Sequence, residues 1–175
     1  IIAMLASTSI GAIWSSCSPD FGIQGVLDRF KQIEPKIIFT ADGYKYNGKV
    51  INLLSKLKGI LSELHSIKTT VIIPFISYGK ADKTSNSILW DDFIDQCATE
   101  ISFEKLPFDY PLYIMYSSGT TGLPKSIVHS AGGTLIQHLK ELQLHIDIKR
   151  SDTIFYFTTC GWMMWNWLVS SLALG

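Results

Sequence analysis

The stretch LYIMYSSGTTGLPKSIVHS, residues 112–130, joins two apolar segments through a polar segment that contains glycine. Residues 112–117 form an apolar run typical of a buried strand, and residues 126–130 are β-like and predict a second strand. Residues 118–125 contain two glycines, a proline and several hydroxyl side chains, which is the composition of a turn. The stretch therefore predicts two strands joined by a glycine-rich loop.

This loop has the chemistry of a phosphate site. Gly119 and Gly122 let the backbone turn its N–H groups toward an anion without a Cβ in the way. Hydroxyl groups add donors, and Lys125 supplies a positive charge that can follow a moving phosphate. The predicted phosphate-binding residues are Ser117, Ser118, Gly119, Thr120, Thr121, Gly122 and Lys125. The alternative is a serine-rich turn that binds nothing, but turns rarely collect so many donors between two apolar strands.

A Walker A loop is the obvious competitor, and the sequence argues against it. Counted from Gly119, that motif needs a glycine at position 124, where this chain has Pro124. A Walker loop also opens a helix whose N-terminus meets the phosphates. Here residues 126–129 are strand-like, and we expect the next helix only after Gly132 and Gly133. The sequence therefore predicts a phosphate loop of a different class.

The rest of the chain alternates between strand-like and helix-like segments. Strands are predicted at residues 12–16, 36–40, 69–75 and 153–159, and helices at residues 1–10, 18–33, 50–64, 90–97 and 135–146. In the last of these helices, Leu135, Ile136, Leu139, Leu142 and Ile146 form the expected apolar stripe. Residues 41–48 and 77–87 are polar and predict loops. This alternation predicts an α/β fold, with a layered, largely parallel sheet and flanking helices.

Composition excludes several classes of function. Fifteen Lys+Arg balance fifteen Asp+Glu, and 47% of the residues are hydrophobic. Such a chain is not a disordered tail, and it lacks the positive field of a non-specific nucleic-acid binder. No apolar run reaches the roughly 18 to 20 residues of a membrane helix. Three cysteines, with no CxxC pair and no clustered histidines, predict a reduced, intracellular protein without a structural zinc site.

Residues 116–130, YSSGTTGLPKSIVHS, resemble the signature loop of the adenylate-forming superfamily, which includes acyl-CoA synthetases, luciferases and peptide-synthetase adenylation domains. Two further stretches, SAGGT at residues 130–134 and GWMMWNW at residues 161–167, resemble the acetoacetyl-CoA synthetases within it. The resemblance extends along the chain, through AIWSSCSPDFG at residues 12–22 and FTADGYKYNGK at residues 39–49.

The resemblance implies a two-step reaction on acetoacetate, ATP and CoA, with Mg²⁺ brought by ATP and no tightly bound cofactor. Thr120 and Lys125 would be the catalytic residues, acting on the phosphates, and no covalent nucleophile is required. Trp162, Met163 and Met164 would line the acyl pocket, although an apolar core helix explains the same residues. Lys45 and Lys49 would contact the CoA nucleotide, although exposed lysines are usually only solvated. His129 is expected to pack or orient rather than act as a base, because a keto acid is already ionised near neutral pH.

The resemblance also implies how much of an enzyme this chain represents. We find no Tyr-Gly-x-Thr-Glu motif for adenine and Mg²⁺, no later ribose aspartate and no lid lysine in the sequence. We expect residues 1–175 to be part of the N-terminal adenylation (AMP-binding) domain of a longer enzyme, without its C-terminal lid domain and inactive alone. Two alternatives stay open: a ligase for another short or medium acid, and a non-catalytic nucleotide-binding module.

Overall fold

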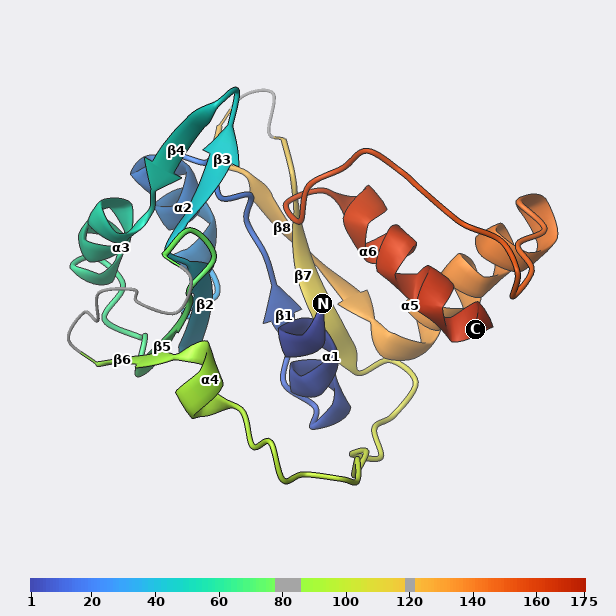
Figure 1. Cartoon of the computed structure of the whole chain (residues 1–175). Helices are drawn as coiled ribbons and strands as arrows, with labels where there is room; N and C mark the ends of the chain where they lie inside the picture. Colours follow the sequence, from blue (N-terminus) through green and yellow to red (C-terminus); the bar gives the residue numbers. More distant parts are fainter. Residues whose placement is uncertain (78–85, 119–121) are drawn as a thin grey trace. The chain divides into compact units, whose positions relative to one another are not determined.

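The computed structural model describes residues 1–77, 86–118 and 122–175 (Figure 1). The chain divides into two compact units. Unit 1 consists of Ile1–Ser18, Ser102–Thr120 and Lys125–Gly175, and unit 2 consists of Pro19–Ile101 and Thr121–Pro124. Each unit combines strands and helices, with one sheet described in unit 1 and a sheet and a separate β-hairpin described in unit 2, which confirms the predicted α/β class.

The sheet of unit 1 contains β1 (Trp14–Ser15), β7 (Pro111–Ser117) and β8 (Lys125–Ser130), in the order β1-β7-β8. β1 is parallel to β7, whereas β7 and β8 form an antiparallel pair, drawn in Figure 1 as two long adjacent arrows. The two strands predicted on either side of the glycine-rich loop are therefore confirmed. Within this sheet, the antiparallel hairpin β7–β8 therefore lies beside the parallel pair β1–β7.

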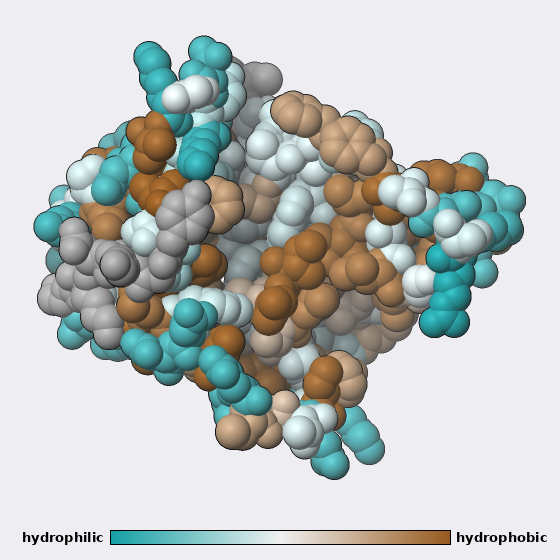
Figure 2. All heavy atoms as spheres, in the orientation of Figure 1, coloured by the Kyte–Doolittle hydropathy of each residue, from teal (hydrophilic) through white to brown (hydrophobic). Residues whose placement is uncertain are grey.

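Five helical segments accompany this sheet in the described part of unit 1. They are α1 (Ile2–Ser9), α5 (Ala131–Leu139), α6 (Met163–Ser170) and the short 3₁₀ helix η2 (Ser171–Leu174), and α5 runs on into the π-helix η1 (Lys140–His145). The core is formed by Met4 of α1, Tyr113 of β7 and Val169 of α6, with Trp14, Leu112, Met115 and Trp165 packed against it. Figure 2 shows apolar side chains gathered on the face where α1 and α6 lie.

Helix α5 departs from its prediction in two ways. It begins at Ala131, directly after β8, because the Ser130 hydroxyl caps it by accepting a hydrogen bond from the Gly133 N–H at 3.3 Å. Its buried residues are Thr134 and His138, whereas Leu135 and Ile136 are more than half exposed. The predicted apolar stripe is therefore wrong for Leu135 and Ile136, because the neighbouring elements offer polar partners to this helix, and it is wrong for Ile146, which is 48% exposed.

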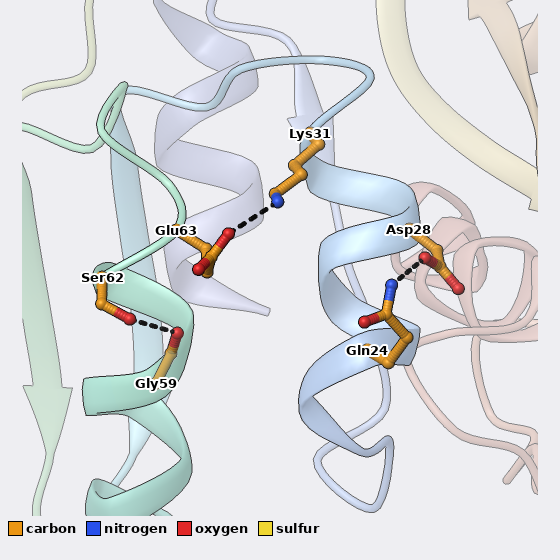
Figure 3. Close-up of polar contacts among 6 residues, drawn as sticks. All are labelled: Gln24, Asp28, Lys31, Gly59, Ser62 and Glu63. Carbon is orange, nitrogen blue, oxygen red and sulfur yellow. Dashed lines mark hydrogen bonds and ion pairs between the residues drawn. The ribbon is translucent and has the colours of Figure 1, made fainter.

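Unit 2 has a parallel sheet of three strands. β2 (Ile37–Ala41), β5 (Thr69–Ile73) and β6 (Ser87–Leu89) lie in the order β2-β5-β6, with helices α2 (Ile23–Phe30), α3 (Leu54–Leu61) and α4 (Trp90–Phe93). The buried hydrophobic side chains of its described residues are Val26, Leu27, Phe30, Leu53, Leu57, Ile60, Leu64, Val71 and Ile72. Figure 3 shows the Lys31–Glu63 ion pair of 2.9 Å, which joins the ends of α2 and α3. Both side chains are about half exposed, so this pair contributes little to stability.

A β-hairpin replaces the loop and the first helical turn predicted after β2. β3 (Gly43–Tyr46) and β4 (Lys49–Asn52) pair antiparallel, and their connection is Asn47 and Gly48, both with positive φ. Asn-Gly is the preferred pair for such a two-residue type I′ turn. The helix predicted over residues 50–64 therefore begins only at Leu54.

Asp42 joins the end of β2 to the segment that follows β5. The carboxylate is 2% exposed and accepts hydrogen bonds from the backbone N–H groups of Phe75, Ile76 and Ser77 at 2.8, 2.9 and 3.0 Å. Burial by itself raises the pKa of Asp42, but the three backbone hydrogen bonds and the nearby Ser77 hydroxyl outweigh it, so the pKa lies below its ordinary value.

The strand predicted at residues 153–159 is absent from the secondary structure of the described chain. Phe155 and Phe157 are 82% and 89% exposed. A strand requires a neighbour to satisfy its backbone N–H and C=O groups, and none of the described residues pairs with this segment. The alternation of apolar and polar residues in this segment was therefore not sufficient to predict a strand.

Candidate functional site

The two ends of the glycine-rich loop are held opposite each other by the β7–β8 hairpin. In the strand register Ser117 is the partner of Lys125, and directly opposed residues project from the same face of a sheet. Ser117 is half-buried, whereas Ser118, Gly122 and Lys125 are exposed. Gly119, Thr120 and Thr121 lie outside the described residues. The structure thus brings Ser117 and Lys125 together at the tip of the hairpin.

The residue that follows the loop also distinguishes it from a Walker A site. Lys125 is the first residue of β8, and α5 begins only at Ala131, after the whole of this strand. A Walker lysine lies at the start of a helix whose N-terminus faces the phosphates. The prediction that this loop connects two strands is confirmed.

One face of the hairpin carries a continuous row of candidate residues. Strand residues two apart point to the same side, so Tyr113, Met115 and Ser117 share a face, with their partners His129, Ile127 and Lys125. The parallel partner of Tyr113 is Trp14 of β1. This face is the one that meets α6, because the amide Nδ2 of Asn166 donates to the Met115 Sδ at 2.9 Å.

A small pocket lies along this face. Its lining residues are Trp14, Ser16, Tyr113, Ile114, Met115, Tyr116, Cys160, Gly161, Trp162 and Asn166. Its volume is about 10 Å³, roughly the space that one water molecule needs. The Ser16 hydroxyl donates to the Cys160 carbonyl, and the Cys160 thiol contacts the Cys17 carbonyl at 3.2 Å. These contacts fix the turn at residues 160–162 against the end of β1.

The three predicted acyl-pocket residues are placed differently from one another. Trp162 lines the pocket and precedes α6, with 66% of its surface exposed. Met163 is 48% exposed and Met164 is half-buried, and neither lines this pocket. The structure therefore associates Trp162, but not the two methionines, with the pocket along β7.

Asn166 is one of the pocket residues that the sequence did not predict. It lies on the buried face of α6, with 3% of its surface exposed, and it lines the pocket. The signal was available, since Asn166 is the only polar side chain between Trp162 and Val169. Its significance was hidden because periodicity alone does not show which face of such an apolar helix is buried.

Buried polar groups lie under the helices next to this face. His138 Nδ1 is 2.7 Å from the Ser170 hydroxyl, which donates to the Asn166 backbone carbonyl at 3.0 Å. Burial lowers the pKa of His138, and the nearby His129 lowers it further. Burial raises the pKa of the Tyr113 phenol, with Thr134 opposing that shift. These groups are therefore neutral near pH 7.

His129 packs against the pocket face rather than lying free. Its ring is 5.7 Å from the ring of Tyr113, and burial lowers its pKa below the usual value. A neutral imidazole, tilted by 38° against the Tyr113 ring, fits the predicted packing or orienting role.

Lys45 and Lys49 do not share a face of the β3–β4 hairpin. Lys45 is paired with Val50, and Lys49 is paired with Tyr46, the residue after Lys45. Successive strand residues point to opposite faces, so the two ammonium groups leave the hairpin on opposite sides. Both lysines are exposed.

The described part of the chain contains neither a cluster of metal ligands nor a membrane-spanning helix. Within residues 1–77, 86–118 and 122–175, no three His, Cys, Asp or Glu side chains come together as a metal site. No helix among the same residues has the length and apolar character needed to cross a bilayer.

Comparison with known families gives a match over the whole chain. The model of a family described as AMP-binding enzyme covers residues 1–175. The chain belongs to this family. Its relatives include the acetoacetyl-CoA synthetases of Gallus gallus, 57% identical over 99% of this chain, and of Rhizobium meliloti, 55% identical over all of it. Malonamoyl-CoA synthetase vrtB of Penicillium aethiopicum is 43% identical over all of it.

A solved structure confirms the fold of this AMP-binding family member. The acetoacetyl-CoA synthetase from Streptomyces lividans superposes with a TM-score of 0.91 and 44% sequence identity, over 99% of this chain and 26% of that one. The chain spans 25 to 27% of the length of the three relatives named above.

Proposed function

We propose that the protein activates acetoacetate with ATP and transfers the acyl group to CoA, as an AMP-forming acid–thiol ligase. In the first step a carboxylate oxygen forms a bond to the α-phosphorus, the bond between the α- and β-phosphates breaks, and pyrophosphate leaves. In the second step the CoA sulfur attacks the acyl carbonyl carbon, AMP leaves, and the thiol proton passes to solvent. Membership of the AMP-binding family and the acetoacetyl-CoA synthetases among its relatives support this proposal.

One observation carries the proposal: the phosphate end of the hairpin and the pocket share a face of β7. Met115 lies two residues before Ser117, which corresponds to about 7 Å along a strand. An acid whose carboxylate attacks the α-phosphate must sit next to the nucleotide phosphates. A pocket that begins one side-chain position from the phosphate loop meets this requirement.

The loop residues would act on the charge that moves during the first step. Negative charge accumulates on the departing pyrophosphate, and preorganised donors stabilise it in the transition state. We assign this role to Lys125 and Thr120, with the hydroxyl or backbone donors of Ser117, Ser118, Gly119, Thr121 and Gly122 around the same phosphates. Mg²⁺ would enter with ATP. The described residues offer no acidic cluster to hold it, so we derive no step from the metal.

The acyl and CoA sides of the site belong to the same proposal. Trp162, Met163 and Met164 would surround the acyl chain, with Trp162 nearest to the β7 pocket. Lys45 and Lys49 would contact the CoA nucleotide, and each would do so from a different face of the β3–β4 hairpin. Residues 1–175 would form part of an adenylation domain, in the cytosol.

A second substrate of related chemistry has one observation in its favour. A malonamoyl-CoA synthetase is 43% identical over the whole of this chain. Malonamate and acetoacetate are both short acids with a carbonyl group on the third carbon. The acid class that we propose is therefore a 3-carbonyl acid, with acetoacetate as the preferred member because its synthetases are more similar to this chain.

The test is an assay of the purified full-length protein with ATP, CoA and acetoacetate. We expect acetoacetyl-CoA, AMP and pyrophosphate in equal amounts, and a lower kcat/KM with acetate, butyrate or malonamate. Release of ADP and phosphate, or absence of AMP with every acid of this series, would contradict the proposal.

A further inference from the structure

Gln32 lies just after α2 and connects that helix to the glycine-rich loop. Its side-chain Nε2 donates to two backbone carbonyl oxygens, that of Asp28 at 2.6 Å and that of Pro124 at 2.8 Å. Pro124 follows Gln32 by 92 residues in the sequence, and both belong to unit 2. A primary amide nitrogen carries two N–H groups. Each N–H group therefore has its own acceptor, one in the helix and one in the loop.

The contact with Asp28 holds the Gln32 side chain against the end of α2. The Gln32 backbone N–H donates to the Arg29 carbonyl at 3.1 Å, three residues back, which leaves the Asp28 carbonyl to the side chain. The last carbonyl groups of a helix need donors from outside its regular pattern, and the Gln32 amide supplies one. The amide of Gln24, shown in Figure 3, instead donates to the Asp28 carboxylate within the same helix. Gln32 is thus anchored to the helix while its second N–H reaches the loop.

The contact with Pro124 restrains the peptide group that leads into Lys125. The proline ring restricts φ of Pro124, and the hydrogen bond to its carbonyl oxygen sets the direction of the following peptide plane. That plane is rigid and includes the backbone nitrogen and the Cα of Lys125. Lys125 is itself the first residue of β8, where it pairs with Ser117 of β7. The backbone of Lys125 is therefore restrained both by its strand partner and by the peptide group before it.

The Gln32 contact is suited to placing Lys125 rather than to stabilising the fold. Gln32 is exposed, and a hydrogen bond in contact with water contributes little net stability because water can replace it. The position of a charged group that acts on a transferring phosphate has a larger effect, since a small displacement lowers the rate of the chemical step. Loss of the Gln32 amide should therefore affect the reaction more than the melting temperature.

We propose that Gln32 is a positioning residue for the first step of the reaction: it holds the Pro124 carbonyl and thereby places the Lys125 ammonium group against the departing pyrophosphate. The inference rests on the proposed function and adds a residue from outside the loop. Gln32 acts through Lys125 and touches no substrate. Because Lys125 stabilises charge that develops in the transition state, loss of the Gln32 amide lowers kcat and leaves the KM for ATP nearly unchanged.

The test measures ATP–pyrophosphate exchange with acetoacetate in the full-length protein and in its Gln32→Met variant, which keeps a side chain of similar length and removes both N–H groups. We expect kcat to fall about 3- to 10-fold, the effect of losing one net hydrogen bond, and the KM for ATP to stay within about twofold of the wild type. The matched control is Gln24→Met, which removes an exposed amide from α2 and should leave kcat and KM unchanged. Both variants should melt close to the wild-type temperature.

A double variant separates positioning of Lys125 from a general structural effect. If Gln32 acts through Lys125, Gln32→Met should cause no further loss of kcat in the Lys125→Ala background. An equal loss in both backgrounds, or a wild-type kcat in Gln32→Met alone, would overturn the inference and leave the proposed function standing. If Gln32→Met is insoluble, Gln32→Ala takes its place with the same expectations. A wild-type protein that catalyses no pyrophosphate exchange would overturn the proposed function and the inference together.

Discussion

His138 of α5 and Ser170 of α6 are joined by a hydrogen bond of 2.7 Å between Nδ1 and Oγ. Because the Ser170 hydroxyl donates to the Asn166 carbonyl, the imidazole Nδ1 is the donor in this pair. The histidine is 7% exposed, so the contact connects two helices inside unit 1. Protonating this imidazole would place a positive charge where water cannot solvate it.

We expect the stability of the protein to depend on pH through His138 and His129. Burial lowers the pKa of both imidazoles in the folded state. The unfolded chain therefore binds more protons, so stability is complete above the unfolded pKa of about 6.5 and is lost as the pH falls below it. Melting temperatures measured between pH 5 and 8 should show this loss. His138→Gln should weaken the pH dependence, whereas His145→Gln, at an exposed position, should leave it as in the wild type.

Lys125→Ala should lower ATP–pyrophosphate exchange by about 100-fold in the full-length protein, since it removes one preorganised charge from the phosphates. Thr120→Ala should have an effect in the same direction. The melting temperature should stay near that of the wild type, because Lys125 is exposed. Lys105→Ala removes another exposed lysine of unit 1 and serves as the control. Pyrophosphate exchange at the wild-type rate in both loop variants would contradict the proposal that this loop binds the phosphates.

Asp42→Asn should destabilise unit 2 by about 1 to 3 kcal/mol. The new amide still accepts from Phe75 and Ile76 through Oδ1, but its Nδ2 meets the Ser77 N–H, and two donors face each other. Urea unfolding followed by fluorescence measures the change. Asp20→Asn, at an exposed position, is the matched control and should change the unfolding midpoint little. Equal midpoints for Asp42→Asn and wild type would show that the carboxylate does not hold the segment after β5.

Gly43→Ala should cost about 1 to 3 kcal/mol, because a Cβ at this position would lie 2.4 Å from the backbone oxygen of Ile51 and must push β4 away. Gly48 offers the comparison within the same hairpin. It has a positive φ of 72° and open space around it, so Gly48→Asn should be nearly neutral. Thermal unfolding of both variants tests the pair, and a similar loss in both would show that close approach at Gly43 is not the constraint.

The sequence predicted those elements whose signals are local. The hydroxyl- and glycine-rich loop between two β-like runs needs no distant partner, and β7 and β8 confirm it. Asn47-Gly48 was a local signal too, and it was overlooked because the leucines that follow suggested a longer helix.

Predictions that depended on tertiary partners did less well. Thr134 and His138 are buried because Tyr113 and Ser170 lie opposite them, which no periodicity within α5 reveals. Residues 153–159 have the pattern of a strand and no pairing neighbour in the described chain. Asn166 belongs to the same group, because its isolation becomes visible only when Met115 is placed beside it.

The site depends on the register of the β7–β8 hairpin, so a shift in strand pairing would disrupt it even if no side chain were replaced. Ser117, Lys125 and Met115 share a face only while Ser117 stays paired with Lys125 and Met115 with Ile127. A slip of one residue between the strands would turn Lys125 to the other side of the sheet, away from the pocket. Alignment along the strands is therefore a separate requirement from composition, and a one-residue insertion within β8 could disable the site more completely than replacing a single loop residue.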